Sequence, residues 1–419
     1  MAGGFNFDEI IDRRNTNCIK WDGIERAISG CDDGDSLRNG DRATGVLPSN
    51  ELLPMWVADM DFRAPSVVLD RIRAAVDHGI FGYTEVPGDV WEAVTAWVES
   101  RYRWSVDPSW MSYTAGVITG LNVAIQTFTR PGEKIVIQPP VYPPFHSSVL
   151  SNGRRIVYNP LRRDDDIHGR YRFDLEGLRS LVDRDTRMLV LCNPHNPVGR
   201  AWSREELEGI AEIALERDLL VFSDEIHADL ILDDLVHCPF ASLGPEIAQR
   251  TITGIAPSKT FNIAGLKASV IITPNEKLRA DFDCAQSRTF GLYHANTFAV
   301  VGMHAAYAYG GEWLDAVLAY LRENRDSALQ YLARHVPGVR AATPEATFLL
   351  WLDFAGTGLA HEEIVRVLRE DAQIILNDGT SFGPGGDRCF RLNFGCPRAL
   401  LDTGMERLGR AFSAREAIG

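Results

Sequence analysis

The chain has 419 residues, of which 45% are hydrophobic and 24% are charged, and its formal net charge is −14. A chain of this length buries a large core and is expected to fold as two or more domains. The acidic balance argues against nucleic acid or an anionic membrane surface as a partner.

The seven cysteines are scattered, odd in number and without a Cys-x-x-Cys pair. This pattern argues against a disulfide framework and against a zinc site, so we expect no metal and a reducing, cytoplasmic setting. Residues 1–9 lack the basic and apolar regions of a secretory signal. No apolar run approaches the roughly 18 residues that cross a membrane.

The first part of the chain reads as a loop followed by an apolar segment and two helices. Residues 29–50 mix glycine, proline and aspartate and predict an exposed loop. The apolar segment at residues 52–62 contains two aspartates and predicts a buried edge that leads into a helix at residues 66–78. A turn at residues 82–84 precedes an amphipathic helix at residues 90–102.

Helical and strand-like patterns then alternate along the chain. Helices are expected at residues 118–128, 175–182 and 204–217, and strands at residues 134–138, 188–192, 219–223, 251–256 and 269–273. Short apolar strands with helical patterns between them predict an α/β fold with a mainly parallel sheet covered on both faces.

The pattern changes near residue 296. A long helical pattern runs to residue 309 and on through residues 313–334, and strand-like pieces follow at residues 347–352 and 389–394. We therefore expect three parts: an N-terminal segment (1–62) that joins the small domain, a large ligand-binding domain (63–295) and a small α+β domain (296–419).

Unusual residues follow the predicted strands, where open parallel sheets bind their ligands. Gly116 and Val117 lie at a strand-to-helix junction that suits a phosphate, although many such turns contain glycine. Tyr142 lies in a proline-rich stretch that predicts a stiff loop, and its ring suits stacking on a planar ligand or plain core packing. Asn196 lies in a turn with two Asn-Pro pairs, where asparagine is also a common turn former. Asp224 ends a buried strand, where a carboxylate needs a partner.

Lys259 is the candidate on which the other residues converge. It lies in the stretch at residues 256–267, directly after an apolar strand, with Ser258 before it and Lys267 eight positions later. Burial beside a second cation lowers the pKa of a lysine and leaves its amine neutral near pH 7. Most isolated lysines are simply solvated, so this assignment depends on the other motifs.

Taken in order, these motifs resemble the class I/II aminotransferase-related enzymes of fold type I, which use pyridoxal 5′-phosphate (PLP). The resemblance extends over nearly the whole chain, through Gly82–Tyr83, residues 115–117, 195–199 and 224–225, Ser258–Lys259 and residues 390–394. Within that superfamily, residues 54–62, 193–200, 223–227 and 256–266 are similar to the MalY/PatB branch of cystathionine β-lyase-like carbon–sulfur lyases. The resemblance implies a large PLP-binding domain with a smaller α+β domain, and a homodimer whose active site lies at the subunit interface.

The resemblance also implies a role for each candidate residue. Lys259 would form the Schiff base with PLP and act as the base, Asp224 would hold the pyridine nitrogen, Asn196 the ring hydroxyl, and Tyr142 the ring face. The phosphate would be held by Gly116, Val117, Ser258, Lys267 and Tyr83, the last from a second subunit. Arg391 would bind the substrate carboxylate, with Tyr83 and Ala58 also in the substrate site. His227, where many aminotransferases carry a tyrosine, would lie beside the cofactor and fits the lyase branch.

The resemblance leaves three functions open. The first is β-elimination from cystathionine or another S-substituted L-cysteine to thiol, pyruvate and ammonia. The second is transamination, or decarboxylation-linked oxidative deamination of a cysteine S-conjugate in specialised metabolism. The third is a non-catalytic regulator that binds a partner protein, which the presence of Lys259, Asp224 and Arg391 disfavours. Tyr142, Tyr83 and Lys259 are equal candidates for protonating the departing sulfur.

Overall fold

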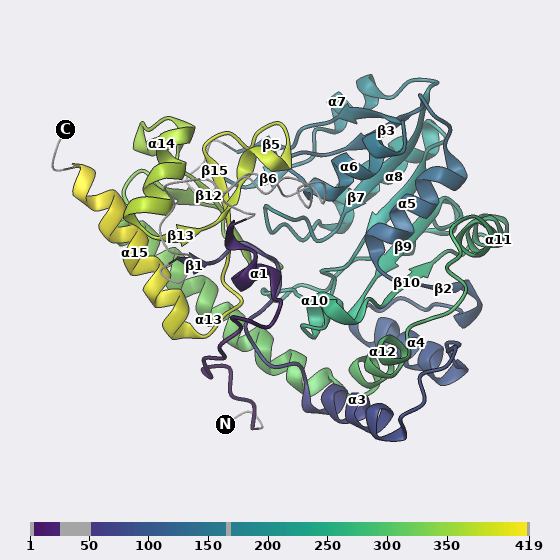
Figure 1. Ribbon diagram of the computed structural model, residues 1–419. Coiled ribbons are helices and arrows are strands. Elements are labelled where there is room, and N and C mark those ends of the chain that lie inside the picture. The colour runs from purple at the N-terminus through teal and green to yellow at the C-terminus, as the bar shows by residue number, and fades with distance from the viewer. Residues whose placement is uncertain (1–3, 26–51, 165–168, 417–419) are drawn as a thin grey trace.

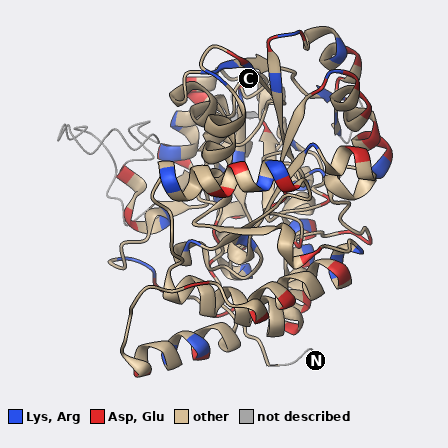
Figure 2. Ribbon diagram, turned by 90° about the vertical axis from the view of Figure 1, so that its right-hand side faces the viewer, with Lys and Arg blue, Asp and Glu red and all other residues tan. Residues whose placement is uncertain are grey.

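The computed structural model describes residues 4–25, 52–164 and 169–416 (Figure 1). The loop predicted at residues 29–50 lies outside the described residues. No helix within these ranges is long and apolar enough to cross a membrane. Lysines and arginines are interspersed with acidic residues along the helices of the face shown in Figure 2.

A seven-stranded sheet forms the centre of the larger part of the molecule, in the order β2-β10-β9-β8-β7-β3-β4. Its strands are β2 (Met111–Thr114), β3 (Lys134–Ile137), β4 (Arg155–Tyr158), β7 (Thr186–Cys192), β8 (Leu220–Asp224), β9 (Thr251–Ile255) and β10 (Ser269–Ile272). β10 is antiparallel to both of its neighbours, and all other neighbouring pairs are parallel. The α/β fold with a mainly parallel sheet is therefore confirmed.

Helices cover both faces of this sheet because successive side chains of a strand point to opposite sides. In β7, Met188 and Val190 pack with α5 (Val117–Phe128), α6 (Pro143–Ser151) and α11 (Glu276–Cys284). Leu189 and Leu191 pack instead with α7 (Leu175–Leu181) and α8 (Arg204–Glu216). Both faces of the strand are apolar, which explains its uninterrupted hydrophobic sequence.

The stiff loop expected around Tyr142 is only half correct. Tyr142 occupies the N-cap position of α6, and Pro143 is the first residue of that helix. Proline suits the first turn of a helix because its missing N–H would have no partner there. The prolines of this stretch therefore start a helix as well as stiffen the chain before it.

The smaller part contains a four-stranded antiparallel sheet in the order β11-β12-β15-β14. Its strands are β11 (Arg340–Ala341), β12 (Leu349–Asp353), β14 (Asn377–Asp378) and β15 (Cys389–Asn393), and its helices include α13 (Gly311–His335), α14 (His361–Arg366) and α15 (Arg398–Glu416). The long helical pattern that begins near residue 296 is divided at Gly310 into α12 (Thr297–Tyr309) and α13. α12 packs against α3 (Ser66–His78) and α4 (Gly88–Tyr102).

The N-terminal segment lies against the smaller part. β1 (Leu53–Pro54) pairs in parallel with β13 (Ile374–Ile375), and the short helix α1 (Ile19–Asp22) lies beside them near the middle of the molecule (Figure 1). We propose on this basis the division into residues 1–62, 63–295 and 296–419.

Candidate active site

Lys259 lies in α10 (Pro257–Thr260), a single helical turn that begins two residues after β9. Its Nζ donates a hydrogen bond of 2.6 Å to the carbonyl oxygen of Ala58. Burial lowers the pKa of Lys259 to about 8, with help from the positive charges of Arg391 and Lys267 and against the negative charges of Asp59 and Asp224. The amine therefore loses its proton close to neutral pH.

Asp224 is the last residue of β8 and is buried. Its Oδ1 accepts a hydrogen bond of 3.1 Å from the backbone N–H of Ile226. Burial nevertheless raises the pKa of Asp224 to about 7, because this bond and the charge of Lys259 only partly offset the cost of desolvation. A buried cationic N–H would be a suitable partner for this carboxylate.

His227 lies three residues beyond Asp224 and is also buried. Burial, together with the nearby charges of Lys259 and Arg391, lowers its pKa well below the usual value, so the ring is neutral. Its Nδ1 is buried without a hydrogen-bond partner among the described residues. Such an atom calls for a further hydrogen-bonding group, because buried polar atoms are nearly always paired.

Arg391 and Asn196 meet from the two halves of the molecule. Arg391, in the middle of β15, is buried and donates from Nη1 to Oδ1 of Asn196 at 3.0 Å and from Nη2 to the carbonyl oxygen of Trp56 at 2.9 Å. Nη2 also donates to Oδ1 of Asn377. The guanidinium lies 5.1 Å from the ring centroid of Phe382. The arrangement fixes a positive charge at the boundary between the two sheets.

The remaining predicted side chains occupy the same edge of the large sheet or its surroundings. Tyr142 is half-buried, and burial raises the pKa of its hydroxyl. Gly116 is the N-cap of α5 and precedes Val117, so backbone N–H groups and the helix dipole meet there. Lys267 follows the turn η4 (Ala264–Leu266) and has a φ of 59°, and Ser258 directly precedes Lys259.

Tyr83 is the one predicted residue that the structure places away from the others. Its side chain is 92% exposed, on the chain between α3 and α4, and its ring contacts His294 at 4.9 Å between centroids. Of the predicted site residues, the cavity at Lys259 is lined by Ala58, Lys259 and Lys267, and Tyr83 is not among its lining residues.

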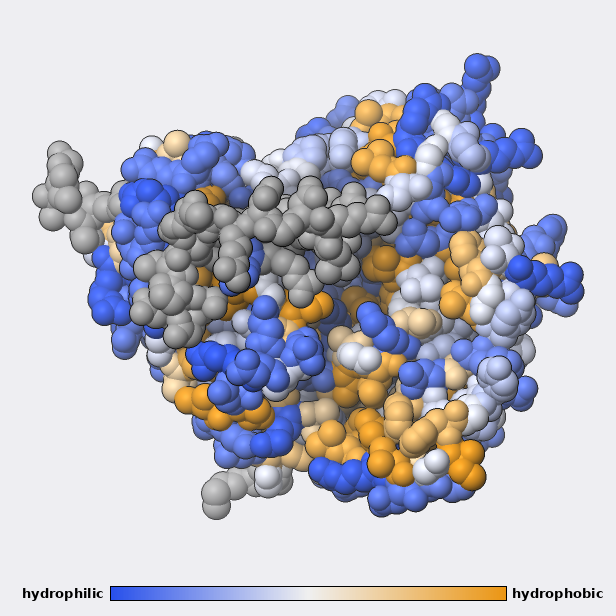
Figure 3. All heavy atoms as spheres, in the orientation of Figure 1, coloured by the Kyte–Doolittle hydropathy of each residue, from blue (hydrophilic) through white to orange (hydrophobic). Residues whose placement is uncertain are grey.

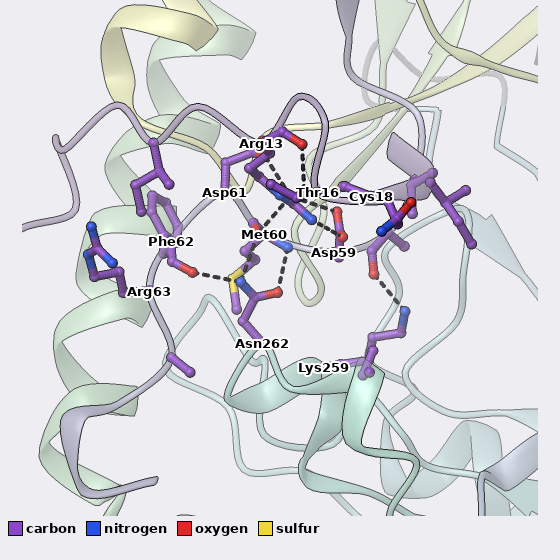
Figure 4. A pocket seen from close by; sticks show the side chains of 18 of the residues that line it. Arg13, Thr16, Cys18, Asp59, Met60, Asp61, Phe62, Arg63, Lys259 and Asn262 are labelled. Atoms are coloured by element: carbon purple, nitrogen blue, oxygen red, sulfur yellow. Dashed lines mark hydrogen bonds and ion pairs between the residues drawn. The ribbon is translucent and has the colours of Figure 1, made fainter. Parts of the chain in front are cut away.

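A cavity of about 700 Å³ opens at Lys259 (Figure 4). Ala58, Lys259, Asn262 and Lys267 form its inner wall, and residues Arg13 and 16–19 of the N-terminal segment form the opposite wall. Within the described ranges, no group of three or more His, Cys, Asp or Glu residues is arranged to hold a metal.

Several residues that line this cavity were not among those predicted from the sequence. Asn262 holds residues 60–62 through three hydrogen bonds, to the N–H and carbonyl of Met60 and to the carbonyl of Phe62, at 2.7 to 2.9 Å. Its place three residues after Lys259 was a usable signal. Arg13 and its neighbours follow no motif, and only the folded chain brings them to the cavity.

Comparison with known proteins identifies the family. Residues 53–408 match the family model for aminotransferase class I and II. The chain is 43% identical to cystathionine β-lyase PatB of Bacillus subtilis (strain 168), over 97% of this chain and 100% of the relative. The chain belongs to the class I and II aminotransferase family.

Solved structures of similar chains agree with this family assignment. A PLP-bound putative aminotransferase from Clostridium difficile 630 superposes with a TM-score of 0.90 at 38% identity, covering 98% of this chain and 100% of that one. Cystalysin from Treponema denticola, which contains a PLP cofactor, superposes with a TM-score of 0.90 at 32% identity, covering 98% and 99%. The family and the fold predicted from the sequence are confirmed.

Proposed function

We propose that this aminotransferase-family protein is a PLP-dependent carbon–sulfur β-lyase. It cleaves cystathionine or another S-substituted L-cysteine by α,β-elimination, and water completes the reaction to thiol, pyruvate and ammonia. The observation that carries the proposal is the buried amine of Lys259, held near its neutral form beside Asp224 in a chain 43% identical to a cystathionine β-lyase.

The residues present fit PLP. The buried carboxyl of Asp224 has a raised pKa and suits a cationic ring N–H as its partner. The positive charge would lower that pKa again and keep the carboxyl ionised at neutral pH. The buried Nδ1 of His227, which has no partner in the described part of the chain, suits a further polar atom of the ligand. The N-terminus of α5 at Gly116 and Val117, with Ser258 and Lys267, suits the phosphate.

When bound, PLP supplies an electron sink that stabilises negative charge on the substrate Cα. Lys259 removes the Cα proton with its neutral amine, and Asp224 keeps the ring nitrogen of the cofactor protonated. Asn196 accepts from Arg391 with Oδ1, which leaves its Nδ2 to donate to the ring hydroxyl oxygen. Tyr142 would cover one face of the ring.

Arg391 binds the substrate carboxylate in this proposal. A guanidinium held by Asn196 and the Trp56 carbonyl is already oriented, so little entropy is lost when it binds an anion. Substrate is oriented by that contact so that its Cα proton faces Lys259.

We also propose a homodimer in which Tyr83 completes the phosphate site of the partner subunit. Tyr83 is 92% exposed, and neighbouring Ile80 and Phe81 are 70% and 56% exposed. Apolar residues gather over the α3 side of the molecule (Figure 3), and exposed apolar patches of this kind mark interfaces.

The scattered free cysteines support a reducing, cytoplasmic location.

Product analysis without any keto acid tests the proposed reaction. The purified protein is mixed with L-cystathionine and, separately, with an S-alkyl cysteine, and pyruvate, ammonia and free thiol are measured. Thiol and pyruvate in equal amounts are expected. A requirement for added keto acid would instead indicate an aminotransferase, which the family name and one similar structure keep as the second candidate. Release of carbon dioxide and an aldehyde would indicate decarboxylation.

A further inference from the structure

Four charged side chains of the N-terminal segment form a network, and three of them, Arg13, Asp59 and Asp61, line the Lys259 cavity (Figure 4). Arg13 donates from Nη2 to Oδ2 of Asp59 at 2.6 Å and from Nη1 to Oδ1 of Asp61 at 2.6 Å. The buried Nζ of Lys20 lies 2.5 Å from Oδ2 of Asp61 and 3.9 Å from Oδ1 of Asp59. The two positive charges balance the two negative charges.

Asp59 directly follows the residue whose carbonyl oxygen accepts the hydrogen bond of Lys259. The backbone on either side of that carbonyl is held firmly, because Nδ2 of Asn393 donates to the carbonyl oxygens of Val57 and Asp59, each at 2.6 Å. The carboxylate of Asp59 is thereby fixed at the rim of the cavity that Lys259 lines. Its negative charge favours the protonated amine of Lys259 even while Asp59 is paired with Arg13, and we expect a larger effect without that pair.

The exposure of these side chains decides whether such a charge matters. Arg13 and Asp59 are 21% and 22% exposed, so solvent and salt screen their charges only in part. Arg63 lines the same cavity, but it is 62% exposed and pairs with Glu9, which is 40% exposed. A pair of that kind has little effect on its surroundings.

We propose that Arg13 is a positioning residue of the active site, which pairs with Asp59 and so limits the negative charge that the Lys259 amine faces from the cavity lining. The inference rests on the proposed function, because it concerns the amine that the function assigns as base. The N-terminal segment thus contributes to the chemistry of Lys259 as well as to the wall of the cavity.

The other charged groups around Lys259 come from separate elements and do not replace Arg13. Arg391 of β15 and Lys267 after η4 favour the neutral amine, whereas Asp224 of β8 and Asp59 favour the protonated one, and His227 is neutral. Without Arg13, the remaining ion-pair partner of the Asp59 carboxylate among the described residues is Nζ of Lys20, which lies 3.9 Å from Oδ1 of Asp59. The pKa of Lys259 then rises and the neutral fraction falls at neutral pH.

Trace acetylation of the full-length, cofactor-free protein measures this effect directly, because acetic anhydride reacts only with neutral amines. The modification of Lys259 is followed by mass spectrometry across the neutral and alkaline range, relative to the exposed Lys277. For Arg13→Gln, the pH of half-maximal labelling is expected to rise by about one pH unit. The matched control Arg63→Gln is expected to give the wild-type curve.

Asp59→Asn separates charge from structure. If charge is responsible, this variant lowers the pH of half-maximal labelling, and the double variant Arg13→Gln/Asp59→Asn returns it toward the wild-type value. If the substitutions only loosened the cavity, water would reach Lys259 and stabilise its protonated form. The pH of half-maximal labelling would then rise for the Arg13 variant and for the Asp59 variant alike. An unchanged or raised value for Asp59→Asn overturns the proposal, even if Arg13→Gln does not fold.

The labelling curve does not depend on turnover. A protein with the expected curves but without lyase products would contradict the proposed function and leave the role of Arg13 standing. Wild-type curves in all variants, together with normal lyase activity, would do the reverse.

Discussion

At the residue scale, burial moves Lys259 and Asp224 toward neutrality from opposite sides. The pKa of Lys259 is lowered to about 8 and that of Asp224 is raised to about 7, in both cases chiefly by desolvation. For both groups, the charged and the neutral forms are consequently much closer in free energy at neutral pH than they would be in water. This is the condition under which one can take a proton and the other can hold one.

The raised pKa of Asp224 predicts a pH dependence of stability in the cofactor-free protein. Between the unfolded pKa near 4 and the folded value of about 7, the folded state binds more protons than the unfolded state, so stability falls as pH rises. Asp224→Asn is expected to remove this loss, which is on the order of 2–4 kcal/mol.

Urea unfolding of the cofactor-free wild type and Asp224→Asn at mildly acidic and mildly alkaline pH checks this prediction. The exposed Asp218→Asn, at a side chain 73% exposed, is the matched control and should follow the wild type. Parallel pH dependences of all three proteins would show that Asp224 is not desolvated in the way described.

Arg391→Lys is expected to raise KM for S-substituted cysteines by about 10- to 100-fold, with a smaller effect on kcat. A lysine cannot keep the contacts to Asn196 and to the Trp56 carbonyl while also presenting two parallel donors to a carboxylate. Steady-state kinetics give the answer, and a conjugate that lacks the carboxylate should be bound equally by both proteins. Equal KM values for the cysteine conjugates would assign the carboxylate to another residue.

The identity of the central residues could be predicted from the sequence because each follows a strand or a short motif. Lys259, Asp224 and Asn196 come directly after predicted strands, and the topology brings strand ends together. The charge balance at Asp59 could not be predicted, because its partner Arg13 is brought there only by the packing of the N-terminal segment. No role was predicted from the sequence for Glu225, which is buried and hydrogen-bonded to Ser223, His237 and the N–H of Phe240.

At the element scale, the segment at residues 56–62 connects the two sheets through backbone hydrogen bonds. Asn393 at the end of β15 binds it from one side, and Asn262 after α10 binds it from the other. The N–H of Asp61 also donates to the carbonyl of Gly395 at 2.9 Å. The apolar sequence at residues 52–62 with its two aspartates is thus mostly irregular, and only β1 within it forms a strand.

Asn393→Ala is expected to lower the free energy of unfolding by about 1–3 kcal/mol, because the carbonyl of Val57 loses its donor and that of Asp59 keeps only a longer contact of 3.4 Å from Nζ of Lys20 among the described residues. The same change should shift the pH at which Lys259 is labelled, since the Ala58 carbonyl loses its fixed position. Denaturant unfolding with unchanged slope measures the first effect. An unfolding free energy within error of the wild type would mean that water replaces Asn393 at both carbonyls.

Patterns of hydrophobicity predicted most helices and strands of the large sheet to within two residues, as in α3 and β7. They did not predict the direction of β10. The connection from β9 to β10 contains only α10 and the turn η4, which return the chain antiparallel, and neither has a hydrophobic period of its own. The helical pattern that runs to residue 309 and on through residues 313–334 corresponds to two helices, α12 and α13, which meet at Gly310.

At the scale of the whole molecule, the proposed dimer would explain why Tyr83 is exposed and absent from the lining of the Lys259 cavity of its own chain. Mixing two defective proteins tests this arrangement. Lys259→Ala removes the reactive amine, and Tyr83→Asp places a negative charge against the phosphate, so each variant alone is expected to be nearly inactive.

Unfolding and refolding the two variants together should restore about one quarter of the wild-type activity, since half of the dimers are hybrids with one intact site. Sedimentation confirms that each parent remains a dimer. Activity no greater than the sum of the parents would show that Tyr83 acts within its own chain or not at all.

The parallel pairing of β1 with β13 has a consequence for synthesis on the ribosome. Leu53 leaves the ribosome early, but its partner Ile374 is made much later. The carbonyls of Val57 and Asp59 likewise cannot bind Asn393 until that residue has been made. The large sheet, complete at β10, is available to fold well before then. Until translation has almost finished, the N-terminal segment around Lys259 therefore lacks its contacts to β13 and to Asn393, and Asn262 is the residue already made that can hold it.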